Sequence, residues 1–461
     1  MSIVSFSFAL FVLAAMILYY TVPKRWQWVV LLIASCFFYA VYSIKYLALL
    51  AAATLITFCS AGYIGKLHLK EKTQDRHTSR NSAKKRKSVL ILALVVNFSL
   101  LAFFKYFNPA ANVLFRLTGN DAIKGLPQLV LPLGMSFYIF QATGYLLDVY
   151  WKRCEAETNF FKFALFVSFF PQMIQGPISR YRQLAPQLFE HKKCDDDIIK
   201  DGIFKILTGL FKKMVIADRL AVLVNGVMTE HWKYGGSTIF FAILIYGVQI
   251  YCDFSGGIDI ISGVANLFAI KLTPNFNRPM LATSIGDFWR RWHITLGSWM
   301  RDYVFYPISL SRWFGKVSKS TRKVLGPRYG KIAALTVSSL IVYILVGVWH
   351  GSSLKYIAFG LWHGFFISLG LISEDFMHKF KKKLHLEKQA WLWRITGIVY
   401  TTVIVTLGRY FSRAGSLTQA LSMFKRTLLH FDLSGFSLST FLDMGLERVD
   451  IWIAAFSTAM L

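Results

Sequence analysis

Two Trp-His-Gly motifs lie thirteen residues apart, at Trp349-His350-Gly351 and Trp362-His363-Gly364. The first motif closes the apolar run from Ala333 to Val348. Histidine titrates near neutral pH and is costly to place at membrane depth, so a histidine in this position suits general base catalysis. The alternative is a histidine beside an interfacial tryptophan that only anchors a helix end. The rest of the sequence bears on this choice.

Other polar residues interrupt apolar segments. Asp253 lies in the run from Val248 to Gly257, where it is either a structural carboxylate neutralised by an arginine or a site residue. A proline-bounded turn at 274–279 precedes the segment 287–296, which packs Trp, Arg and His together. Pro and Gly also break the apolar run at 170–181, and such breaks survive in membranes only inside protein or along a cavity. The pattern predicts a membrane-embedded cavity lined by His, Asp, Arg, Trp and Asn.

Several other kinds of active site are excluded. The chain has no Gly-x-x-x-x-Gly-Lys-Ser/Thr loop and no Gly-x-Ser-x-Gly elbow. Its five cysteines show no metal-binding or disulfide spacing, so we expect no metal site. Two classes remain open: an acyltransferase with a histidine base in a membrane tunnel, and a transporter whose broken helices bind a substrate at the midplane.

The composition is that of a polytopic, all-α membrane protein. Hydrophobic residues make up 55% of the 461 residues and charged residues only 16%, against roughly 25% charged in soluble domains. At about 20 residues per span we expect about eleven transmembrane helices. The candidate spans are Ile3–Tyr20, Trp26–Tyr42, Tyr46–Ile64, Ser88–Tyr106, Leu129–Tyr150, Phe160–Met173, Ile239–Phe254, Ile258–Ile270, Ile332–Val348, Tyr356–Leu371 and Trp391–Leu407.

Two further segments are amphipathic and predict interfacial helices. Asp197–Met228 mixes lysines with apolar residues, and Ile285–Tyr303 places its apolar side chains on one stripe at 100° per residue, with His293 at the border. The final apolar run, Ile451–Leu461, is too short to span a bilayer, so we expect a half-span or a helix cut short at 461. We expect one integral-membrane domain over 1–461, with its motif-rich core at about 129–373.

The net charge of +28 is concentrated in clusters. Lys66–Lys87 holds nine Lys/Arg and two acids and is predicted to be a mobile loop, Arg312–Lys331 holds seven and no acid, and a third cluster covers Lys379–Lys388. Basic loops stay cytosolic, which places the N-terminus outside and both Trp-His-Gly motifs at one outer hairpin. The clusters either set topology alone or also attract an anionic cytosolic partner.

The ordered set of motifs resembles the membrane-bound O-acyltransferase family. It comprises Gln175-Gly176-Pro177-Ile178, Asp253-Phe254-Ser255-Gly256, Asn275-Phe276-Asn277-Arg278-Pro279, Phe288-Trp289-Arg290-Arg291-Trp292-His293, Arg301-Asp302-Tyr303 and Gly347-Val348-Trp349-His350-Gly351. Within the family, the chain looks like the bacterial branch that acetylates alginate and other exopolysaccharides, with the D-alanyl transfer protein of teichoic acid synthesis as a near relative. The resemblance implies a helical bundle around a central tunnel.

The resemblance also implies site residues. The family's invariant histidine falls on His350 and its second histidine on His293, so both are expected to be catalytic. The supporting positions near the tunnel are expected at Asp253, Asn275, Asn277, Arg278, Trp289, Arg290 and Trp349. We expect His293 or a nearby donor to polarise a thioester carbonyl and His363 to be structural. From the residues alone, an arginine of the segment 287–296 could either pair with Asp253 or hold a phosphate or carboxylate.

The implied function is O-acylation, most simply acetylation, of an extracellular polysaccharide. The donor is expected to be a cytosolic thioester, acetyl-CoA or an acyl carrier protein, with no permanently bound cofactor. The expected partners are an extracytoplasmic, esterase-like acetyltransferase, a cytosolic acyl carrier and the bilayer of the bacterial inner membrane, with no nucleic acid. The alternatives are D-alanyl transfer to teichoic acid and transport of a lipid or glycan precursor without acyl transfer.

Overall fold

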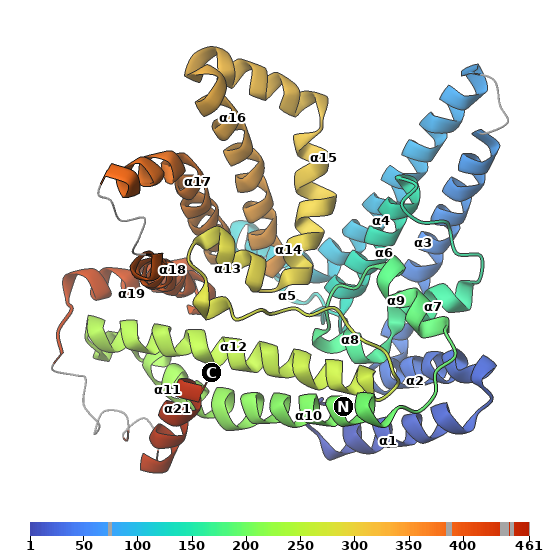
Figure 1. The fold of residues 1–461 in the computed structure, drawn as a ribbon, viewed down its shortest axis with the longest axis horizontal. Helices are drawn as coiled ribbons and strands as arrows, with labels where there is room; N and C mark the ends of the chain where they lie inside the picture. Colours follow the sequence, from blue (N-terminus) through green and yellow to red (C-terminus); the bar gives the residue numbers. More distant parts are fainter. Residues whose placement is uncertain (72–75, 384–389, 434–441, 443–446, 461) are drawn as a thin grey trace. The chain divides into compact units, whose positions relative to one another are not determined.

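The computed structural model describes residues 1–71, 76–383, 390–433, 442 and 447–460. Apart from an isolated bridge between Phe276 and Trp292, the regular structure of these residues is helical (Figure 1). Seven of the described helices are long and apolar enough to cross a membrane, which confirms a multi-pass, all-α protein. The expected count of about eleven spans is not confirmed.

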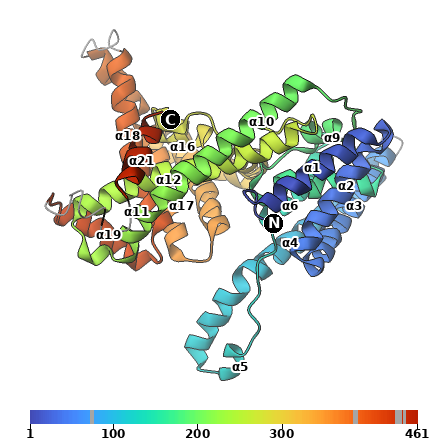
Figure 2. The same cartoon turned by 90° about the horizontal axis from the view of Figure 1, so that it is seen from below.

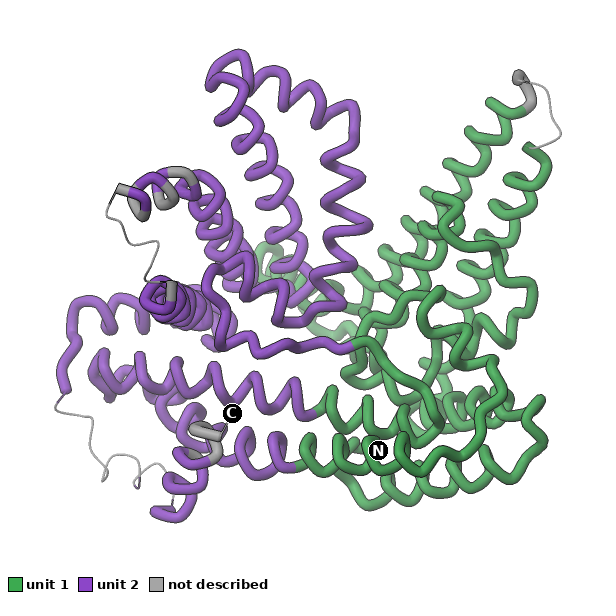
Figure 3. The backbone as a smooth tube through the Cα atoms, viewed as in Figure 1, with its two compact units in different colours: residues 1–210, 257–273 green, residues 211–256, 274–461 purple. Residues whose placement is uncertain are grey.

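The chain divides into two compact units, and each is described separately (Figure 3). Unit 1 holds residues 1–210 and 257–273, and unit 2 holds residues 211–256 and 274–461. The helices of unit 1 are α1 (Phe6–Thr21), α2 (Gln27–Tyr42), α3 (Ile44–Glu71), α4 (Arg76–Thr118), α5 (Asp121–Lys124), α6 (Met135–Tyr150), α7 (Phe160–Ser168), α8 (Phe170–Gln175), α9 (Tyr181–Phe189) and α10 (Asp196–Leu210).

Unit 2 contains the segments that carry most of the predicted site. Its helices are the π-helix Phe211–Ala217, α11 (Asp218–Thr229), α13 (Ile285–Arg291), α14 (Ile294–Met300), the π-helix Arg301–Phe305, α15 (Tyr306–Ser309), α16 (Arg312–His350), α17 (Leu354–Lys383), α18 (Ala390–Arg413), α19 (Leu417–Leu429) and α21 (Arg448–Met460). The unit boundary falls inside α12 (Gly236–Asn266).

The predicted span Phe160–Met173 is broken into α7 and α8 at Phe169. Ser35 Oγ accepts a hydrogen bond from the Phe170 N–H (3.1 Å), and the Gln172 side chain donates to the Phe166 carbonyl (2.9 Å). Phe170 and its neighbours are fully buried. The backbone break is therefore enclosed by protein, as membrane depth requires.

Unit 1 also carries an arm built from the end of α4 and from α5, which extends away from the other helices of that unit (Figure 2). The Asn108 side chain closes its base, because it donates to the Leu129 carbonyl (2.7 Å) and accepts from the Leu129 N–H (2.9 Å). α4 continues well past the predicted span end at Tyr106, and α6 begins at Met135 instead of Leu129.

The separate spans predicted at Ile239–Phe254 and Ile258–Ile270 are wrong, because α12 is one helix of 31 residues. Within this helix Gly257 permits close packing, since a Cβ there would overlap the Gln175 amide oxygen. A buried glycine in a helix can thus mark a close helix contact instead of a helix end.

The basic segments are helical and are not the loops we predicted. Most of Lys66–Lys87 belongs to α3 and α4, and residues 72–75 lie outside the described part of the chain. Arg312–Lys331 forms two helical limbs that turn at Gly326 (φ 79°) and Pro327, where Thr321 Oγ1 donates to the Gly330 carbonyl (2.8 Å). Part of Lys379–Lys388 also lies outside the described residues.

Candidate functional site

The two Trp-His-Gly motifs sit on one tightly packed helical hairpin in unit 2. His350 is the last residue of α16, and α17 begins four residues later at Leu354. Gly347 and Gly360 let the two backbones touch: a Cβ at Gly347 would overlap the Tyr356 carbonyl, and one at Gly360 the Tyr343 carbonyl. Small residues at such positions are typical of close helix packing in membranes. The expected hairpin is therefore present, although the second motif lies inside α17.

Ring contacts link the histidines through this hairpin. The His350 ring lies 5.7 Å from that of Phe359, which lies 4.6 Å from that of His363. The His350 ring also lies 4.8 Å from the Trp349 ring, which lies 5.9 Å from the His293 ring. These distances join ring centroids. His293 and His363 are 4% and 1% exposed, whereas His350 is exposed. The Trp289 ring lies 4.9 Å from that of His363. We call these six rings the histidine cluster: Trp289, His293, Trp349, His350, Phe359 and His363.

His293 is held by an unusual backbone conformation. It lies between α13 and α14 in the left-handed region (φ 48°, ψ 51°), where non-glycine residues are uncommon. The helix predicted over Ile285–Tyr303 is therefore interrupted. The segment 275–277 pairs with the backbone on both sides of His293. The Asn277 N–H donates to the Arg291 carbonyl (2.9 Å), and the Ile294 N–H donates to the Asn275 carbonyl (3.0 Å), so these bonds replace helical ones.

The Asn275 side chain fixes the proton on the His293 ring. Asn275 Oδ1 accepts from the Thr295 N–H (3.0 Å) and from its hydroxyl (2.9 Å), and it lies 3.3 Å from His293 Nδ1. An amide oxygen only accepts, so Nδ1 carries the proton and Nε2 carries a lone pair. Nε2 is buried and has no hydrogen-bond partner among the described residues. This tautomer does not suit the predicted role of His293 as a donor to a carbonyl.

Burial keeps His293 uncharged. Desolvation, with the nearby His350 as a smaller cause, lowers the pKa of His293 to about 3. The ring is thus neutral at pH 7 and acts through its Nε2 lone pair.

A cavity of about 260 Å³ adjoins His293. Its polar or charged lining residues are Trp289, His293, Arg301, Ser339 and Tyr343. The remaining lining residues are glycine or apolar: Gly286, Leu296, Gly297, Met300, Phe305, Val342, Val346 and Ile367. Trp289 Nε1, like His293 Nε2, is buried without a hydrogen-bond partner among the described residues, and both side chains line this cavity. An unsatisfied donor and an unsatisfied acceptor therefore lie beside it.

The α12 segment borders the other side of His293. The Phe254 ring lies 4.9 Å from the His293 ring. Its neighbour Asp253 pairs with Lys213 of the π-helix Phe211–Ala217, so its partner is a lysine and not the arginine considered as one alternative. π-Helical turns are rare in proteins, and those that occur are often found at functional sites. Sequence reasoning missed Lys213 because it read this stretch as an ordinary amphipathic helix.

Besides Asp253, three predicted site residues lie away from the histidine cluster. Asn277 and Arg278 are exposed, and Arg278 adopts a left-handed conformation before the turn at Pro279–Leu281. Arg290 is exposed and lies 3.5 Å from Asp287, which also pairs with Arg291 at 3.0 Å. The structure therefore brings together His350, His293, Asn275, Trp289 and Trp349, the last four within or directly beside the cluster's buried part.

Arg409 of α18 is a buried cation that sequence reasoning missed. It is 7% exposed and has no carboxylate within 4.0 Å among the described residues. Its guanidinium occupies the notch at Gly247, where a Cβ would overlap it, and a Cβ at the preceding residue, Gly408, would lie 2.8 Å from His363 Nε2. An arginine within an apolar helix is itself a signal for a site, but the predicted span stopped at Leu407.

Comparison with known proteins gives consistent matches. The model of the membrane-bound O-acyltransferase family matches residues 156–411. The chain is 33% identical to a probable alginate O-acetylase of Pseudomonas aeruginosa and to a peptidoglycan O-acetyltransferase of Helicobacter pylori, in each case over 72% of this chain and 61% of the relative. It is 30% identical to a teichoic acid D-alanyltransferase of Bacillus subtilis over 48% of this chain and 54% of that protein. The chain thus spans about six tenths of the length of the first two relatives.

Proposed function

Because this chain belongs to the membrane-bound O-acyltransferase family, we propose that it transfers an acyl group, most simply acetyl, from a thioester to a hydroxyl during O-acylation of an extracellular polysaccharide. The relatives named as O-acetylases of alginate and peptidoglycan support acetyl as the group transferred. The chain lies in the bacterial inner membrane with its N-terminus outside, as the distribution of basic residues predicts.

One observation carries this proposal: an exposed histidine and a buried, neutral histidine share one cluster beside a cavity. His350 is accessible to an acceptor, while His293 and Trp289 present a lone pair and an N–H toward the interior. Acyl transfer requires a base for the hydroxyl and a polar environment for the carbonyl, and the cluster offers both.

The chemistry proceeds by addition and elimination. His350 accepts the proton of the attacking hydroxyl as its oxygen bonds to the thioester carbonyl carbon. The carbon–sulfur bond then breaks, the thiolate leaves, and the proton on His350 passes to the sulfur. The products are an ester and a free thiol. A general base of this kind contributes about 10²–10⁴-fold to the rate.

We assign the carbonyl donor to Trp289 instead of His293. The indole N–H can only donate, whereas Nε2 of neutral His293 accepts. Trp289 Nε1 then hydrogen-bonds the carbonyl oxygen as negative charge develops on it, and His293 accepts a hydrogen bond from an N–H or O–H of the bound substrate. Both side chains line the same cavity.

The donor thioester, acetyl-CoA or an acyl carrier protein, approaches from the cytosol, and an extracytoplasmic acetyltransferase receives the group or delivers the acceptor. The basic limbs of α16 support this direction, because they attract phosphate-bearing or acidic donors. Labelling tests the topology. In a cysteine-free chain, an impermeant thiol reagent added outside should modify Ser352→Cys and not Lys84→Cys, and the reverse pattern would refute the orientation.

D-Alanyl transfer is the second candidate, since a teichoic acid D-alanyltransferase is among the relatives. Mass spectrometry of the surface glycan with and without the gene separates the two. Loss of acetyl esters supports the main proposal, and loss of D-alanyl esters supports the second. In liposomes, glycan-precursor flux without ester formation would instead favour the transporter.

A further inference from the structure

A second cavity, of about 480 Å³, lies in unit 1 between α3 and α4. Lys66 and Lys70 of α3 and Lys85 of α4 line it, together with two polar residues of α4, Asn81 and Ser82. The remaining lining residues, Tyr63, Leu67 and Leu69, are apolar or aromatic. The cavity therefore combines three cations with an apolar wall and has no acid among its lining residues.

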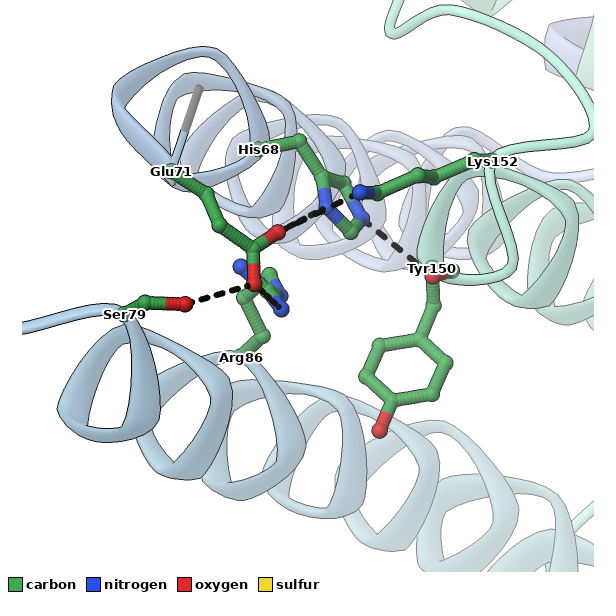
Figure 4. Close-up of polar contacts among 6 residues, drawn as sticks. All are labelled: His68, Glu71, Ser79, Arg86, Tyr150 and Lys152. Carbon is green, nitrogen blue, oxygen red and sulfur yellow. Dashed lines mark hydrogen bonds and ion pairs between the residues drawn. The ribbon is translucent and has the colours of Figure 1, made fainter. Parts of the chain in front are cut away.

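A polar network fixes the helices beside this cavity (Figure 4). The Glu71 carboxylate accepts hydrogen bonds from Arg86 (3.0 Å), Lys152 (3.2 Å) and Ser79 (3.2 Å), and His68 Nδ1 lies 3.9 Å away. Lys152 follows the end of α6, so the network ties α3 and α4 to that helix end. One carboxylate faces two permanent cations, which leaves the local charge positive.

The network engages the carboxylate of Glu71, which directly follows the lining residue Lys70 in α3. Glu71 is engaged by Arg86 and Lys152, and neither Lys66 nor Lys85 has a carboxylate within 4.0 Å among the described residues. Both lysines are exposed, as are Lys84 and Lys87 on the same helix, which do not line the cavity. The positive charge of Lys66 and Lys85 is thus available to a ligand.

We propose that this cavity binds the phosphodiester headgroup of an anionic phospholipid. Its cations and its amide and hydroxyl groups match a phosphate, while the apolar wall matches the first part of an acyl chain. The cavity lies at the ends of two helices long enough to span the bilayer, where headgroups are found. Basic pockets between transmembrane helices are known to bind such headgroups on the cytosolic side. This site is independent of the proposed acyl transfer.

The test measures binding of phosphatidylglycerol to the full chain in phosphatidylcholine nanodiscs by native mass spectrometry. Lys66→Ala/Lys85→Ala should weaken binding about 30-fold, since each lysine near the surface contributes about 1 kcal/mol and 1.4 kcal/mol is tenfold. The matched control Lys84→Ala/Lys87→Ala removes the same charge from outside the cavity and should change binding by less than about threefold. Lys66→Arg/Lys85→Arg should retain binding because the charge is kept.

Three results would overturn the proposal. Equal losses in both alanine pairs would reduce the site to general surface attraction. Displacement of the lipid by millimolar sn-glycerol 3-phosphate would assign the cavity to a soluble phosphate. Unchanged lipid binding with a raised KM for an acyl carrier protein would assign it to an acidic protein.

Discussion

His350 and His293 belong to one cluster yet occupy opposite environments. His350 ends a long helix and is exposed, while His293 is 4% exposed, sits in a left-handed conformation and is held by Asn275. An exposed imidazole can meet an acceptor that arrives on a macromolecule and can exchange protons with solvent. A buried, neutral imidazole can do neither, but its orientation is fixed. The difference fits the proposed division of roles, in which His350 performs proton transfer and His293 positions the substrate.

The largest expected effect follows from removing the exposed histidine. His350→Ala should lower acyl transfer in liposomes by about 10²–10⁴-fold, because it removes the general base. The helix end should persist, so expression and thermal unfolding should stay near wild type. His430→Ala, at another exposed histidine, is the control and should be fully active. A folded His350→Ala protein with normal turnover would eliminate the general-base role.

Removing the buried histidine should cost less. His293→Ala should reduce turnover by about 10–100-fold, roughly the value of one or two hydrogen bonds to the reacting groups. Alanine also disfavours the left-handed backbone, whereas asparagine tolerates it. His293→Asn therefore serves as the matched variant. If both variants kept wild-type kinetics, His293 would have only a packing role.

The same contrast predicts a dependence of stability on pH. The pKa of His293 is about 3 when folded and about 6.5 when unfolded, so between these values the unfolded chain binds more protons. Stability must therefore fall as the pH is lowered through this window, by about 2 kcal/mol from pH 7 to pH 5 through this residue. His293→Asn should flatten this part of the curve, as measured by chemical unfolding in detergent. An unchanged slope would contradict the assigned burial effect.

The smallest effect concerns the basic limbs of α16, which lie between the two catalytic candidates in the sequence and contain neither of them. Replacing Lys316, Lys319 and Lys323 with alanine leaves four of the seven basic residues, so insertion should be preserved. The KM for the donor should rise a few-fold at low salt, and the defect should shrink as salt rises, since the Debye length is about 8 Å at 0.15 M. A KM that does not change at low salt would leave these residues with a role in topology alone.

Local patterns predicted some parts of the site and could not predict others. The Trp-His-Gly motifs and the hairpin that carries them were predictable, because their spacing and the turn are local. The interruption at His293 was not, since it depends on hydrogen bonds from chain 275–277 that override helical periodicity. The Lys213–Asp253 pair joins residues 40 positions apart through a π-helix that no period predicts.

The structural role of a glycine could not be predicted from the sequence either, because it depends partly on contacts with distant residues. Gly257 lies between two spans that we predicted separately, but it allows a close contact inside α12, whereas Gly326 turns the chain. Composition cannot distinguish these uses, because the first depends on what packs against the residue and the second on its own φ. The basic segments were misread as loops, since charge predicts the side of the membrane but does not exclude a helix.

The glycine contacts of the α16–α17 hairpin also bear on how the protein is made. The contacts join Gly347 to Tyr356, Tyr343 to Gly360 and Leu340 to Gly364, so each pair is farther apart in sequence than the one before. Contacts between residues close in sequence cost the least chain entropy and form fastest. We therefore expect this hairpin to pair outward from its turn during synthesis, before α18 has left the ribosome. His350 and His363 would then be neighbours before Arg409 has emerged to pack against His363.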